Sequence, residues 1–114
     1  MIKDATDNNI DDILKSTRTF IIVFYDTGMP NMDNVFKIFE EFDSQFQGKI
    51  DMYKCEIVKN RGKMVKYFNM NSLPAMVMMK NNKPYANVAG AVSAMSYQNA
   101  IAKGIMDIMN DNPW

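Results

Sequence analysis

One run of residues constrains the fold of this chain more than any other feature. Residues Thr17–Tyr25 read TRTFIIVFY, a β-branched and aromatic stretch without polar alternation. A strand with one solvated face shows such alternation, whereas a strand that is buried on both faces does not. The run therefore predicts a central strand that other elements cover on both sides of a sheet.

The pattern changes to helical spacing after this strand. Turn residues occupy Asp26–Asn31, and a helix is expected over Met32–Phe46, with an apolar stripe formed by Val35, Phe39, Phe42 and Phe46. A second strand is expected over Lys49–Ile57. Because a long helix separates these two strands, the sequence predicts a right-handed parallel crossover between them.

Two further helices are expected over Asp7–Lys15 and over Asn60–Phe68, the second with Met64, Val65 and Phe68 as its apolar members. A strand over Ala75–Met79 is expected to lead through a turn over Lys80–Lys83 into a strand over Tyr85–Val88. The last helix is expected to start at Ser93, to bury Tyr97, Ile101, Ile105 and Ile108, and to end at Asp111-Asn112-Pro113. Asn82 suits the left-handed position that a tight hairpin turn needs. The order αβαβαββα over residues 1–114 predicts one α/β domain. Its mixed central sheet combines parallel strands with a C-terminal antiparallel hairpin, and helices flank both faces.

Composition and charge exclude several classes of function. Thirteen basic residues balance thirteen acidic ones, so the chain lacks the positive field that nucleic-acid binding needs. No apolar run approaches the roughly 20 residues of a membrane helix, and the N-terminus is too polar for a signal peptide. We therefore expect a soluble, cytoplasmic domain that binds neither nucleic acid nor membrane. The twelve methionines, with many Asn, Lys and Ile residues, are typical of the AT-rich coding of a phage or a low-GC bacterium.

Two absences limit the chemistry further. The chain has no histidine, which excludes Ser-His-Asp and Cys-His catalysis and every imidazole metal site. Its one cysteine, Cys55, excludes an intrachain disulfide and any dithiol redox couple. No metal and no cofactor are expected.

Four segments at matching separations carry a resemblance to a known family. They are Phe24-Tyr25, Met29-Pro30-Asn31-Met32, Ser72-Leu73-Pro74-Ala75 and Gly90-Ala91-Val92-Ser93. With the order of elements, they make the chain similar to the thioredoxin family from about Asp4 to Met109. The resemblance implies a thioredoxin-like fold.

The departures from the family pattern concern its reaction. Redox members have a Cys-x-x-Cys pair where this chain has Met29 and Met32, and a thioether can neither ionise nor exchange disulfides. The family's buried acid corresponds to Val23, its tryptophan to Gly28 and its helix-kinking proline to Lys37. The resemblance therefore implies a chain that is not a disulfide oxidoreductase and not an enzyme.

The remaining motif suggests binding. In the family, the proline that matches Pro74 follows a cis peptide bond, lies opposite the motif and adjoins backbone that pairs with extended peptides. The resemblance thus implies a binding groove, with Val88 in its wall, formed by Tyr25, Met29, Pro30, Met32, Leu73, Pro74 and Gly90. Such backbone binds a peptide by adding a strand to the sheet. We expect a non-redox interaction module or non-catalytic subunit with a protein or peptide partner; the sequence does not determine its oligomeric state.

Several residues admit a second interpretation. Met29 and Met32 could be Cu(I) ligands, although packing at the helix start suits them better without cysteine or histidine nearby. Cys55 fits an inert buried thiol; a redox sensor needs exposure and a cationic neighbour, and Lys54 points to the opposite face. Pro74 could be a turn proline without a role in recognition.

Two charged sets and one other function also stay open. The acidic Glu40, Glu41 and Asp43 fit the solvated face of a long helix. A solvated short helix or a docking patch is formed by the basic Lys59, Arg61, Lys63 and Lys66. The basic set would suit an acidic partner. The alternative function is an enzyme with non-dithiol chemistry, such as a glutathione-dependent transferase, or redox sensing by Cys55.

Overall fold

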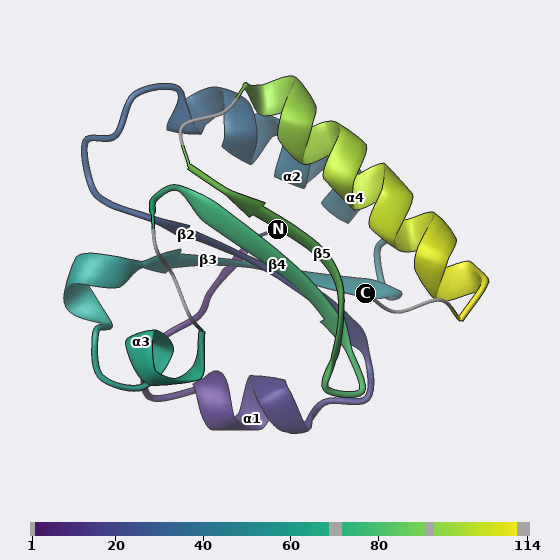
Figure 1. Cartoon of the computed structure of the whole chain (residues 1–114), viewed down its shortest axis with the longest axis horizontal. Helices are drawn as coiled ribbons and strands as arrows, with labels where there is room; N and C mark the ends of the chain where they lie inside the picture. The colour runs from purple at the N-terminus through teal and green to yellow at the C-terminus, as the bar shows by residue number, and fades with distance from the viewer. Residues whose placement is uncertain (1, 69–71, 91–92, 112–114) are drawn as a thin grey trace.

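A computed structural model describes residues 2–68, 72–90 and 93–111, and Figure 1 shows a central twisted sheet with helices on both faces. The elements are β1 (Lys3–Asp4), α1 (Ile10–Lys15), β2 (Thr19–Tyr25), α2 (Met32–Gln45), β3 (Ile50–Glu56), the 3₁₀ helix η1 (Ile57–Lys59), α3 (Lys63–Tyr67), β4 (Ala75–Lys80), β5 (Lys83–Ala89) and α4 (Ala94–Met109). The predicted α/β class with a mixed sheet is confirmed.

The sheet has the strand order β1-β3-β2-β4-β5. Strands β1, β3 and β2 are parallel to one another, and β2 is the central strand of the sheet. Strand β4 is antiparallel to both β2 and β5. The predicted parallel crossover and C-terminal hairpin are therefore both present. The hairpin turns at Asn81 and Asn82, whose φ angles are 52° and 63°. Sequence reasoning named only Asn82 as left-handed.

The predicted two-sided burial of β2 is confirmed, because every residue from Phe20 to Phe24 is at most 2% exposed. Ile21 and Val23 pack under α2 and α4 with Phe39 and Tyr97, in the larger core cluster. On the other face, Phe20, Ile22 and Phe24 pack with residues of α1 and α3 in a second cluster.

The start of the chain differs from the prediction. The first helix begins at Ile10 rather than Asp7, and the two-residue strand β1 precedes it. The Asp7 carboxylate accepts hydrogen bonds from the N–H groups of Gly62, Lys63 and Met64, at 3.0 to 3.2 Å. Asp7 therefore caps α3 rather than starting its own helix. A strand as short as β1 has too few residues to show a period.

Some predicted core positions are only partly buried. Val65, one of the apolar residues of the short helix, is 52% exposed. The side chains of four further predicted core residues are also partly exposed, namely Phe42, Phe46, Ile105 and Ile108. The last three border an open hollow of about 330 Å³ beside Thr19 and Ile50, where β2 and β3 begin. Asn112 and Pro113, which were expected to end the last helix, lie outside the described residues.

Within the described ranges, every helix falls short of the length and apolar character that a membrane crossing requires.

Candidate functional site

The segments that carry the resemblance meet at one end of the sheet. Strand β2 ends there at Tyr25 and β5 ends there at Ala89, while the antiparallel strand β4 begins there at Ala75. Figure 1 shows the loop after β2 and the starts of α2 and α4 above this end, with η1 and α3 below it.

The loop between β2 and α2 holds the side chain of Met29 in place. The Met29 N–H donates to the Asp26 carbonyl oxygen at 3.2 Å, and the Asp26 N–H donates to the Met29 sulfur at 3.3 Å. Gly28 and Asn31 have φ angles of 87° and 66°, in the left-handed region that glycine and asparagine tolerate best. These two residues let the chain reverse direction tightly before α2.

The Pro74 loop faces this motif. The Leu73–Pro74 peptide bond is cis, which is the isomer that the resemblance implies. The Gly90 N–H donates to the Pro74 carbonyl oxygen at 2.9 Å, and the φ of Gly90 is 94°. By contrast, neither the N–H nor the C=O of Leu73 is hydrogen-bonded to another described backbone group.

A hollow of about 260 Å³ lies between the motif and this loop, and we call it the Pro74 hollow. It is lined by Met29, Pro30, Asn31, Met32, Val35, Pro74 and Ser93. Four residues of the predicted groove, Met29, Pro30, Met32 and Pro74, thus lie together. Sequence reasoning did not name Asn31, Val35 and Ser93 as groove residues, although each lies in a motif or helix that it did identify.

Other residues of the predicted groove lie elsewhere. The Tyr25 ring packs edge-on against Phe36, with centroids 5.2 Å apart, and borders a separate polar hollow beside Lys54 and Glu56. Burial, and secondly the charge of Glu56, raise the pKa of Tyr25. Gly90 contributes the backbone hydrogen bond to Pro74 rather than a wall.

Leu73 also points away from the Pro74 hollow. It borders a further hollow of about 290 Å³ together with Ile57, Arg61 and Val65, which we call the Arg61 hollow. Val88 packs half-buried against the larger core cluster.

Neither the residue at the family's acid position nor the cysteine lines the Pro74 hollow. Val23, at the position of the family's buried acid, is 0% exposed and carries no titratable group. Cys55 is buried in the cluster on the other face of the sheet. Burial, and secondly the carboxylates of Asp7 and Glu56, raise the pKa of its thiol to about 12. A thiol that stays protonated is neither a nucleophile nor a metal ligand at neutral pH.

The members of the two charged sets are mostly exposed, and two of the basic ones form ion pairs with carboxylates outside the acidic set. Lys59 forms an ion pair with Glu56 at 3.2 Å, and Lys63 forms one with Asp11. Glu40 and Glu41 are exposed on α2, and Asp43 is half-buried. Among the residues that the structure describes, no three His, Cys, Asp or Glu side chains converge on a point that could hold a metal ion.

Comparison with known proteins agrees with this geometry. The family model described as thioredoxin matches residues 1–103 of the chain. Thioredoxin C-2 of Corynebacterium nephridii is 25% identical to it over 91 residues, which make up 79% of this chain and 83% of that protein.

Proposed function

The chain belongs to the thioredoxin family, and from this premise we propose that it is a redox-inactive member that binds a polypeptide partner through the Pro74 hollow. It would serve as an interaction module or as the non-catalytic subunit of an assembly. The single observation that carries the proposal is the lining of the hollow, which includes Met29, Pro30, Met32 and Pro74. Met29 and Met32 place thioethers at the two positions where the reaction would need thiols.

The loss of redox chemistry is supported by the sulfur inventory. Dithiol exchange needs a thiolate and a second thiol that resolves the mixed disulfide. The chain has one cysteine, and it is buried on the other side of the sheet from the hollow. Both motif positions hold methionine.

Retention of binding is supported by the surroundings of Pro74. The N–H and C=O of Leu73, which pair with no other described backbone group, can hydrogen-bond an extended peptide, which is how a strand is added to a sheet. The side chains of Met29 and Met32 are flexible and polarisable, which suits them to contact varied apolar groups.

A location in the cytoplasm stays a prediction.

A transferase-like enzyme has weaker support. Its chemistry would need an activated hydroxyl or thiol at the hollow. Ser93 supplies the hydroxyl of the lining, and its Oγ lies 3.2 Å from Ser96 Oγ. No histidine in the chain could activate it as a general base.

The proposal is tested by affinity capture with the tagged full chain, followed by calorimetry on the captured protein. Met29→Asp places a charge in the hollow and is expected to weaken binding about tenfold or more, or 1.4 kcal/mol. Glu41→Lys, on the exposed side of α2, is the matched control and is expected to change binding less than about twofold. Circular dichroism checks that both variants fold.

Two results would contradict the proposal. Normal binding by Met29→Asp beside lost binding by Glu41→Lys would assign the partner to α2. Turnover of a thiol or disulfide substrate by the wild-type chain would show that the chain is an enzyme.

A further inference from the structure

The Arg61 hollow borders a segment with exposed apolar side chains, one of which lines it, and the proposed function does not use this segment. The segment formed by η1 and α3 leaves Val58, Val65 and Tyr67 exposed by 48%, 52% and 42%. Val65 also lines the hollow, with Ile57 and Leu73. Apolar side chains that gather around a hollow mark binding surfaces more often than ones that are scattered singly.

The charges around this hollow are unevenly paired. Residues 57–68 contain four cations and no carboxylate. Lys59 and Lys63 have the carboxylate partners described above, and Asp7 accepts three backbone N–H groups of α3. In the part of the chain that the structure describes, no carboxylate pairs with the guanidinium of Arg61. The hollow therefore combines apolar walls with the Arg61 guanidinium, which forms no ion pair with any described carboxylate.

The chain connects this hollow directly to the Pro74 hollow. Leu73 lines the Arg61 hollow, and the next residue, Pro74, lines the other. The backbone groups of Leu73, at this junction, pair with no other backbone group in the described ranges. An extended segment that pairs with Leu73 could therefore reach both hollows with side chains on successive residues.

We propose that the partner's segment continues from the Pro74 hollow across Leu73 into the Arg61 hollow. In the Arg61 hollow, this segment places one apolar side chain and one carboxylate. This inference rests on the proposed function. The apolar side chain contacts Ile57 and Val65. The carboxylate accepts from the guanidinium of Arg61, whose planar fork matches the two carboxylate oxygens.

The test uses a library of random peptides displayed on phage and selected against the immobilised full chain. The expected result is enrichment of peptides that combine apolar and acidic residues. A fluorescein-labelled synthetic peptide of the enriched sequence is then titrated by fluorescence anisotropy. Its affinity should fall about tenfold or more with Arg61→Glu, and it should fall as the salt concentration rises.

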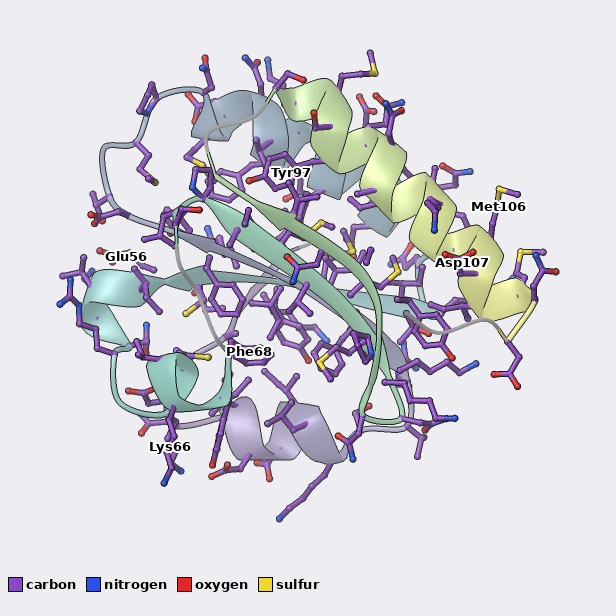
Figure 2. The ribbon with its side chains drawn as sticks, viewed as in Figure 1. Glu56, Lys66, Phe68, Tyr97, Met106 and Asp107 are labelled. Carbon is purple, nitrogen blue, oxygen red and sulfur yellow. The ribbon has the colours of Figure 1, made fainter. Side chains whose placement is uncertain are left out.

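Lys66→Glu is the matched control because it makes the same charge change on the same surface segment. Figure 2 shows the Lys66 side chain extending away from the body of the molecule, and Lys66 does not line the hollow. Its effect should stay within about twofold, as for other exposed charges. Arg61→Lys keeps the charge without the fork and should bind between wild type and Arg61→Glu.

The outcomes separate this inference from the proposed function. Enriched peptides without acidic residues, or equal effects of Arg61→Glu and Lys66→Glu, would overturn the inference. If Met29→Asp still abolished binding of those peptides, the proposed function would stand. Acidic peptides that need Arg61 but ignore Met29→Asp would overturn the continuity between the two hollows. A selection that enriches no peptide would count against both.

Discussion

Leu73 and Pro74 are consecutive residues, yet their side chains line two separate hollows at the same end of the sheet. Pro74 faces the loop and helix that hold Met29 and Met32, whereas Leu73 faces η1 and α3. The groove that sequence reasoning described as one surface is therefore divided at this loop, and Tyr25 lies outside both parts.

The chain should be inactive in disulfide reduction. Wild-type protein is expected to leave the rate of insulin reduction by dithiothreitol at the buffer level, because neither motif position has a thiol. The double variant Met29→Cys with Met32→Cys should form a disulfide but reduce insulin poorly, because the buried Val23 cannot move a proton. Wild-type turnover that persists in Cys55→Ser would show that the chemistry lies elsewhere.

Two phenylalanines should be decisive for folding. Phe24 is 1% exposed, with its ring centroid 5.1 Å from that of Phe68, and Phe39, on the buried face of α2, is 0% exposed. Replacing either with Ala should lower the free energy of unfolding by about 3–5 kcal/mol, measured by urea denaturation. Phe42→Ala should cost less, because Phe42 is only partly buried.

Val65→Ala is the control for these core variants, since Val65 is 52% exposed. Its expected effect is within about 0.5 kcal/mol. Losses below about 1 kcal/mol for both Phe24→Ala and Phe39→Ala would contradict the packing of the two core clusters.

Cys55 should be protected from alkylation until the protein unfolds. Its pKa is raised from 9.0 to about 12, so the folded state holds the proton more tightly than the unfolded state. This contribution to stability is complete below about pH 9 and is lost as the pH rises towards 12. Iodoacetamide labelling, followed by mass spectrometry at pH 8, should be slow without urea and fast with it. Equal rates would show that the thiol is accessible.

Replacing Tyr97 with phenylalanine should make the folded protein more stable. The Tyr97 side chain, on the buried face of α4, is 0% exposed in the position that Figure 2 shows, and its hydroxyl has no hydrogen-bond partner among the described residues. Burial raises the pKa of this hydroxyl to about 12. Tyr97→Phe removes the unpaired group and should raise the free energy of unfolding by about 1–3 kcal/mol. A loss of stability in urea denaturation would indicate that a bound water satisfies the hydroxyl.

The spacing of apolar and polar residues predicted much of the fold, because it reports burial locally. The run through Phe20–Phe24 predicted two-sided burial, and the spacing of Val35 and Phe39 predicted the inner face of α2. Local pattern failed where partners come from distant segments. Asp7 caps α3 across more than fifty residues, and β1 exists only because it pairs with β3.

The sequence by itself determined that this chain has no intrachain dithiol couple, because that chemistry needs two thiols and the chain has one cysteine. It also determined which loops could form a surface. Only the tertiary structure decided how that surface is divided, because the direction of a side chain at a loop depends on what packs against it. Pro74 is held by its hydrogen bond to Gly90, and Leu73 packs with the core cluster that contains Ile57 and Met64. Two adjacent residues thus serve different hollows, which no local pattern records.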